Sequence, residues 1–363
     1  MCGFFSPAIH NIHLLRFQMD VTLYRNVSWG GWASDIRYTT NLLDNLPDNV
    51  RGYSIRAPSL PFIKHYLHKE VIYPLAARGH QGDVNHISDH SYAGLLRALD
   101  PSKTLVTCQD LIPLDAPGEA SKLGLMRYRL NVSCLPRAAK IIAVSQSTKD
   151  ALMRHFNIAD ESIEVVYHGV GGVFKPLHDR GFLRKKHGFT NPTILHVGSS
   201  YPRKNVRFIL EVLKDIEGAN LVKVGFLNRS DRRFMAREGL STRVLQIDPP
   251  LDDIRLNGYY NMADLLFMPS LHEGFGHPVT EAMAAGCPVL CSDIPVFHEL
   301  FDGAVEFTSP YDVGEAGSKV RDMLASDRTK LARKGLDKAG ELTLQREADS
   351  TYKVYEEVHE QRR

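Results

Sequence analysis

Short apolar segments alternate with helical patterns along almost the whole chain, and the alternation occurs twice. The apolar runs of the first series lie at 19–24, 84–87, 104–108 and 140–144, and those of the second at 193–197, 221–224, 244–247 and 265–268. Such alternation predicts parallel strands joined by crossover helices. The sequence therefore predicts an α/β protein in which two similar domains repeat the same arrangement.

The domain limits follow from where the pattern starts and stops. Residues 1–18 do not join the pattern, and we expect this extension to lie outside the fold. The first domain is predicted over 19–172 and the second over 188–345. Residues 173–187, which are charged and weakly patterned, are expected to link them.

Composition limits the class of protein. The chain has 363 residues, 24% charged and 43% hydrophobic, and Lys+Arg 44 nearly balance Asp+Glu 42. This balance argues against nucleic-acid binding. The five cysteines form no Cys-x-x-Cys pair, which favours a reducing compartment. No apolar run reaches the roughly 20 residues needed to cross a bilayer. We expect a cytoplasmic protein, and contact with the inner face of the membrane stays open.

The segment 268–292 concentrates unusual chemistry. It carries Glu273 and Glu281, seven residues apart, and between them a turn followed by a predicted helix over 278–285. The turn and helix start consist of Gly274, Phe275, Gly276, His277 and Pro278. Glycine permits close approach of a ligand, and a helix N-terminus favours negative charge. The segment therefore predicts a phosphate site flanked by two carboxylates.

A second candidate site follows the predicted strand 193–197. Gly198 and Ser199 form a turn, and Arg203 and Lys204 precede an amphipathic helix. A guanidinium fork and a lysine charge at a strand end can neutralise a diphosphate. We interpret both sites as parts of one ligand-binding region.

These motifs together resemble the family-4 retaining glycosyltransferases, whose E-x7-E segment matches Glu273 and Glu281. The resemblance implies the GT-B fold, two Rossmann-like domains with parallel sheets facing a central cleft, with a C-terminal helix, here 346–363, that packs back on the N-terminal domain. It implies that Glu273 lies against the donor sugar and Glu281 binds the ribose. It also places Arg203 and Lys204 on the donor diphosphate.

The resemblance extends less closely to other positions. Gly31 corresponds to a glycine loop that faces the donor phosphate, and Ile247 lies in the loop beside the nucleobase. Gln109 stands where the family usually has a histidine that contacts the donor sugar. Glutamine has no proton to exchange near neutral pH, so either Gln109 only orients the sugar or His86 or His90 takes a related place.

The predicted function is metal-independent transfer of a hexose, with retention, from a nucleoside-diphosphate sugar to a glycan, lipid-linked or small-molecule hydroxyl in polysaccharide or glycoconjugate synthesis. Catalytic roles are predicted for Glu273, Lys204, Arg203 and Gln109. UDP-glucose is favoured over GDP-mannose only by general frequency. We expect no cofactor and, because the chain has no Asp-x-Asp, no metal.

Other functions remain open. A nucleotide-sugar epimerase or a phosphorylase would share the fold, and a non-catalytic sugar-nucleotide-binding partner would fit the Gln at 109. A dinucleotide-dependent oxidoreductase is disfavoured because no predicted strand is followed by Gly-x-Gly-x-x-Gly.

Overall fold

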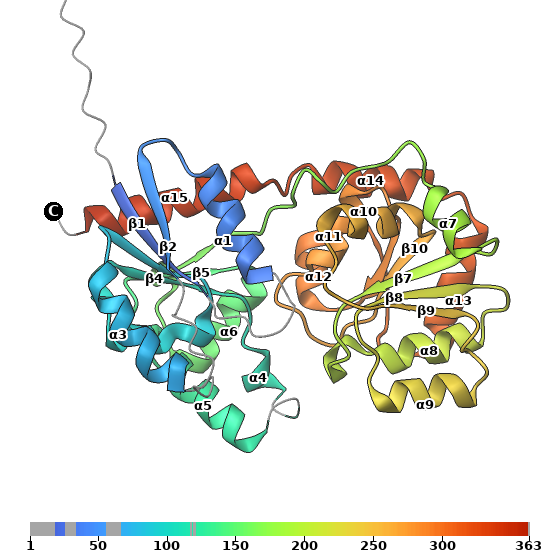
Figure 1. The fold of residues 1–363 in the computed structure, drawn as a ribbon, viewed down its shortest axis with the longest axis horizontal. Helices are drawn as coiled ribbons and strands as arrows, with labels where there is room; N and C mark the ends of the chain where they lie inside the picture. The colour runs from blue at the N-terminus through green and yellow to red at the C-terminus, as the bar shows by residue number, and fades with distance from the viewer. Residues whose placement is uncertain (1–18, 26–33, 56–66, 117, 119–120, 362–363) are drawn as a thin grey trace, which may run out of the picture.

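Two α/β domains lie side by side in the computed structural model, which describes residues 19–25, 34–55, 67–116, 118 and 121–361 (Figure 1). Each domain contains a six-stranded sheet, ordered β2-β1-β3-β4-β5-β6 in the first and β12-β11-β10-β7-β8-β9 in the second. All paired strands are parallel. Helices cover both faces of each sheet, which confirms the predicted pair of Rossmann-like domains.

The first domain is built from these described elements: β1 Met19–Tyr24, α1 Ser34–Asn45, β2 Val50–Ile55, α3 Tyr73–Ala77, β3 Val84–Ile87, β4 Thr104–Cys108, α4 Ile112–Asp115, α5 Lys122–Val132, β5 Lys140–Ala143, α6 Gln146–Phe156 and β6 Ile163–Val165. Its central strands β3 and β4 are buried throughout, because helices cover both faces of the sheet (Figure 1).

The second domain is built from α7 Phe182–His187, β7 Thr193–Val197, α8 Val206–Lys214, β8 Asn220–Val224, α9 Arg229–Arg237, β9 Val244–Ile247, α10 Asp253–Met262, β10 Leu265–Met268, α11 His277–Ala284, β11 Val289–Ser292, α12 Pro295–Phe301, β12 Glu306–Thr308, α13 Val313–Ala325 and α14 Thr329–Ala339. The predicted helix over 278–285 corresponds to α11. Leu183 of α7 packs against the core of this domain, so the predicted linker 173–187 contains a helix that belongs to the second domain.

The last helix, α15 Leu344–Glu360, lies on the first domain. Thr343 caps it by accepting a hydrogen bond from the Arg346 N–H. Tyr355 and Val358 of α15 join the apolar core that contains Val21 of β1. Figure 1 shows the helix running along the first domain after the chain has completed the second. In the described residues, no helix is both long enough and apolar enough to cross a membrane.

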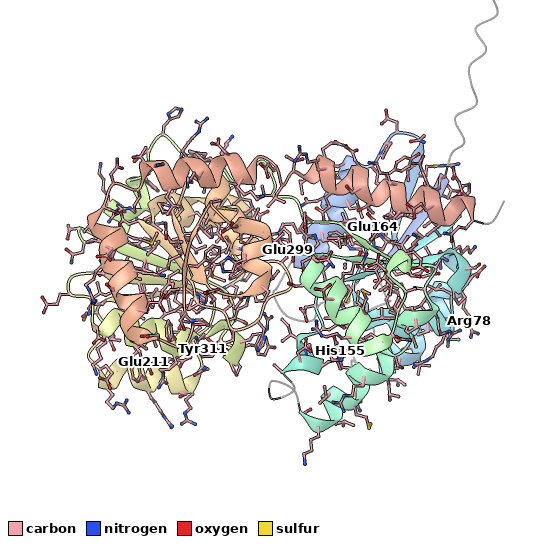
Figure 2. The ribbon with its side chains drawn as sticks, turned by 180° about the vertical axis from the view of Figure 1, so that it is seen from behind. Arg78, His155, Glu164, Glu211, Glu299 and Tyr311 are labelled. Carbon is pink, nitrogen blue, oxygen red and sulfur yellow. The ribbon has the colours of Figure 1, made fainter. Side chains whose placement is uncertain are left out.

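The two domains touch through their facing loops. Glu299 of α12 accepts hydrogen bonds from the Gln146 and Ser147 N–H groups at 2.6 and 3.0 Å, so a side chain of the second domain caps α6 of the first. Figure 2 shows Glu299 at the junction of the domains. Ser145 Oγ also donates to the Gly274 carbonyl at 2.8 Å. The carboxyl ends of the two sheets are therefore brought together across the junction.

Candidate functional site

The two predicted cations of the second domain meet the first predicted carboxylate. Lys204 Nζ donates to Glu273 Oε1 at 2.5 Å, and Arg203 contacts Glu273 Oε2 at 3.4 Å. The Ser270 hydroxyl donates to Glu273 Oε1 at 2.7 Å. Burial opposes ionisation of Glu273, but the charges of Lys204 and Arg203 outweigh it and lower its pKa. Glu273 is therefore a carboxylate held by two cations.

These groups converge because of strand order. The turn of Arg203 and Lys204 follows β7, and Glu273 follows β10, its neighbour in the sheet. Parallel neighbours end at the same edge, where ligands of such sheets bind. A Leu271 N–H also donates to the Arg203 carbonyl at 2.7 Å, which joins the two loops.

The turn after Glu273 leads directly into α11. Gly276 has a φ of 111° and a Cβ there would lie 2.7 Å from Phe297, so only glycine fits. Pro278 occupies the first turn, and in the described part of the chain no side chain caps the helix. Its exposed N–H groups therefore suit an anion.

Glu281, one turn into α11, faces a different side of the turn from Glu273. Its carboxylate accepts hydrogen bonds from Tyr260 at 2.7 Å and from Arg37 of α1 at 3.0 Å. Arg37 also contacts Asp253 at 2.9 Å. Burial raises the pKa of Glu281, and Arg37 opposes this shift. Arg37, which the sequence did not single out, thus links the first domain to the carboxylate expected to bind ribose.

Gln109 contacts His168, and through it Glu347, two residues that sequence reasoning did not assign to the site. Its Oε1 is 2.8 Å from His168 Nε2, and His168 Nδ1 is 2.6 Å from Glu347 Oε1 of α15. His277 packs on His168 with 4.7 Å between ring centroids and 31° between the ring planes. The position of His168 at a strand end was the one available signal; Glu347 resembles any helical glutamate.

The remaining candidates lie around this centre. Gly198 and Ser199 follow β7, and Ile247 ends β9 and accepts from the Gly225 N–H at 2.8 Å. Lys223 of β8, which is fully buried, donates to the Gly198 carbonyl at 2.5 Å and stabilises this turn. Gly31 lies outside the described residues.

His86 and His90, the two histidines considered as substitutes for a histidine at position 109, have structural partners. His86 is buried between Tyr355 and Thr107, at 2.8 and 2.7 Å, and burial lowers its pKa to about 3. His90 accepts from the Gln109 N–H at 3.2 Å and pairs with Tyr128 at 2.9 Å. His90 thus supports the loop of Gln109, and His86 joins β4 to α15.

Two cavities flank the point where the domains touch. One, of about 250 Å³, is lined by Arg37, His168, His277, Glu281 and Glu347. The other, of about 420 Å³, is lined on the first domain by Asp110 and Ser147 and on the second by Glu273. Between them, Gly274 approaches the Gln109 carbonyl so closely that a Cβ would lie 1.9 Å from it.

Two protein-family models match the chain. Residues 13–171 match the model described as Glycosyltransferase Family 4, and residues 179–341 match the model described as Glycosyl transferases group 1. Both halves of the chain match glycosyltransferase families.

Similar proteins carry related names. The chain is 29% identical over 229 residues to the O-antigen chain mannosyltransferase RfbU of Salmonella typhimurium, a match covering 60% of each chain. It is 28% identical over 230 residues to the serotype-specific mannosyltransferase WbdA of Escherichia coli, which covers 59% of this chain and 28% of WbdA. The match thus spans three fifths of RfbU and a smaller part of WbdA.

Solved structures share the fold. Sucrose-phosphate synthase from Thermosynechococcus elongatus gives a TM-score of 0.76 at 18% identity, covering 94% of this chain and 99% of that one. Anabaena Alr3699/HepE in complex with UDP-glucose gives 0.77 at 17% identity, covering 93% and 100%. The glycosyltransferase fold with two Rossmann-like domains, GT-B, is therefore the fold of this chain.

Proposed function

We propose that this chain is a retaining glycosyltransferase that moves a hexose from a nucleoside-diphosphate sugar to a carbohydrate or lipid-linked hydroxyl. The observation that carries the proposal is the joining of Lys204, Arg203 and Glu273 at the sheet edge beside the N-terminus of α11. Cations and free helix N–H groups serve a diphosphate, and carboxylates serve sugar hydroxyls. The matches to glycosyltransferase families in both halves support the same activity.

For the donor we propose mannose first and glucose second. The names of RfbU and WbdA support mannose, whereas the sequence favoured UDP-glucose only by frequency. GDP-mannose and UDP-glucose differ in both base and sugar, so the two donors are distinguished by direct binding.

In the proposed mechanism, most of the catalysis comes from electrostatic stabilisation of the departing diphosphate. When the bond from the anomeric carbon to the diphosphate breaks, negative charge gathers on the departing phosphate oxygen. Lys204, Arg203 and the first N–H groups of α11 are the donors for that charge. Losing one such donor costs about 2.7–4 kcal/mol of transition-state stabilisation. The departing phosphate oxygen accepts the proton of the attacking hydroxyl, on the same face of the sugar, which gives retention.

Calorimetry tests the donor site. GDP, GDP-mannose, UDP and UDP-glucose are titrated into the protein, into Lys204→Met and into the control Lys185→Met, an exposed lysine of α7. We expect one nucleotide pair to bind, and Lys204→Met to weaken it by about tenfold or more. Equal binding to Lys204→Met, or none of the four bound by the unaltered protein, contradicts the proposal.

A turnover assay tests transfer. We expect free nucleotide to appear only when an acceptor is present, and the new glycosidic bond to keep the donor's anomeric configuration by NMR. Donor binding without transfer to any carbohydrate or lipid-linked acceptor would favour a non-catalytic binding protein, the alternative that the Gln at 109 keeps open.

For the acceptor we propose a lipid-linked glycan met at a membrane surface. Helix α5 exposes Leu123, Met126 and Leu130, each about half accessible to solvent (51%, 52% and 53%). Lys122 and Arg129 of the same helix are exposed as well. Apolar side chains beside cations suit an anionic lipid surface.

Sedimentation with phosphatidylglycerol vesicles tests this surface. The triple variant with serine at the three apolar positions should lose binding relative to the unaltered chain. Equal sedimentation of both proteins, or binding to neither anionic nor neutral vesicles, contradicts the membrane contact.

A further inference from the structure

Four arginines line one recess on the outside of the second domain. Arg229, Arg233 and Arg237 stand four residues apart on α9, so they lie on one face of that helix. Arg207 of α8 lines the same recess, which has a volume of about 500 Å³. None of its described lining residues is a carboxylate. We call these four side chains the arginine face.

The arginine face is held in place by the helix that carries it. Phe234 of α9 is buried and lies under two guanidinium groups. The Cζ atom of Arg207 is 4.2 Å from the ring centroid, and that of Arg237 is 5.3 Å from it. Arg207 also donates to the Ser230 carbonyl at 2.9 Å. Stacking on an aromatic ring orients a guanidinium group and leaves its N–H groups able to bind an anion.

The charge of the arginine face is only partly balanced. Arg207 pairs with Asp231 at 3.2 Å, and Arg237 is 2.9 Å from its neighbour Glu238. Arg229 and Arg233 are exposed, and neither forms an ion pair with any residue that the structure describes. Like charges four residues apart destabilise a helix. A surplus of positive charge is thus concentrated here, although the whole chain carries only +2, and the recess suits an anionic partner.

The arginine face lies on the same side of the molecule as the exposed apolar side chains of α5. Figure 1 shows α9 along the lower edge of the second domain and α5 along the lower edge of the first, whereas α14 and α15 follow the opposite edge. Both helices are again at the lower edge when the molecule is seen from behind (Figure 2). One surface is apolar and the other is cationic. Stable attachment to a membrane needs two such signals.

We propose that the arginine face docks on anionic lipid headgroups, so that α9 and α5 attach both domains to one membrane surface. The proposal rests on the membrane contact proposed for α5 and extends it to the second domain. Guanidinium groups donate to the phosphate oxygens of such headgroups, often in pairs. The cleft between the domains then stands beside the lipid surface, within reach of an acceptor whose lipid stays in the membrane.

Vesicle sedimentation compares the arginine face with an equal loss of charge elsewhere. One triple variant removes the arginines of α9: Arg229→Gln, Arg233→Gln and Arg237→Gln. The matched control removes three exposed cations of α14, on the opposite edge of the molecule: Lys330→Gln, Arg333→Gln and Lys334→Gln. Each variant loses three positive charges, so an effect of net charge alone would be the same in both.

The two variants should differ strongly. Each arginine near an anionic surface strengthens binding about fivefold, so the α9 variant should bind phosphatidylglycerol vesicles about a hundredfold more weakly. The α14 control should stay within about twofold at about 0.15 M salt, because charges farther than about 8 Å from the lipid are screened. Neither substitution should change the weaker binding to neutral phosphatidylcholine vesicles, to which the apolar side chains of α5 contribute.

A double variant keeps the test valid if the triple variant is destabilised. Arg229→Gln with Arg233→Gln removes only the two arginines without an ion pair among the described residues, and it should weaken binding to phosphatidylglycerol vesicles about 25-fold. The melting temperature and the Kd for the nucleoside diphosphate should match those of the unaltered chain. The reason is that neither arginine contacts Lys204 or Glu273.

The outcomes separate this inference from the proposals on which it rests. Equal vesicle binding by the α9 variant and the α14 control overturns docking of the second domain, while the α5 contact and hexose transfer stand. An unaltered chain that binds polyglutamate or single-stranded DNA at the same salt, but no vesicles, also overturns it in favour of a soluble polyanion. An unaltered chain that sediments with no vesicles overturns both membrane contacts, and the donor titration still decides hexose transfer.

Discussion

Gly274 approaches the first domain so closely that the substitution Gly274→Ala is predicted to disturb the contact between the domains. The new Cβ would lie 1.9 Å from the Gln109 carbonyl oxygen, whereas ordinary contact begins at 3.4 Å. The difference is 1.5 Å, and the obstructing atom is backbone, so no side chain can rotate away. The backbone at 274 has no positive φ, so alanine itself is compatible with the turn. The two domains must therefore separate locally by about this distance.

The expected effect is loss of transfer with retention of donor binding. A displacement of about 1 Å between reacting groups can cost about a hundredfold in rate, so kcat should fall by that order. Lys204, Glu273 and Glu281 all belong to the second domain, so the Kd for the nucleoside diphosphate should change only a few fold.

Steady-state transfer and calorimetry on the same preparation check both expectations. Gly79→Ala is the matched control, because a Cβ there meets nothing within 4 Å. Full transfer activity in a folded Gly274→Ala protein would refute the requirement for this contact.

Three further predictions concern charge. Burial lowers the pKa of Lys223 to about 7, below the unfolded value of about 10.4. The contribution of Lys223 to stability should therefore be greatest above about pH 10.4 and decline as pH falls toward 7. At pH 6 the charged, buried Lys223 should cost at most about 5 kcal/mol of folding stability. Lys223→Met should remove this part of the pH dependence when thermal unfolding is measured from pH 6 to 10. An unchanged pH dependence in the variant contradicts the prediction. Glu281→Gln should weaken nucleoside-diphosphate binding about tenfold by calorimetry. The control Glu238→Gln, which alters a half-buried glutamate paired with Lys214 and Arg237, should leave binding unchanged. Transfer should persist in EDTA, and loss restored by magnesium or manganese would disprove metal independence.

The central strands and the candidate-site residues that follow them could be predicted because they depend on local sequence. Parallel strands buried on both faces are continuous apolar runs, so 193–197 and 265–268 stood out. Once these two strands are neighbours, the residues after them, Lys204 and Glu273, must meet at one edge. Pro278 and the glycines before it likewise marked the start of α11.

Other features depend on contacts that no local pattern encodes. Arg37 and Glu281 are 244 residues apart, and His168 and Glu347 are 179 apart. The first pairing requires the two domains to be docked, and the second requires α15 to return to the first domain. The edge strands β2 and β12 were not predicted either, because β2 is largely exposed and contains Gly52, and β12 has three residues.

The position of α15 has a consequence for how the chain folds during synthesis. His86 and Tyr355 bond at 2.8 Å although 269 residues separate them. Between Val165, which ends β6, and Leu344, which begins α15, the ribosome must add 178 residues, roughly 10–40 s of elongation. Through that interval one apolar face of the first sheet lacks its covering helix. The second domain, though made later, has all its strands before the first can complete its core.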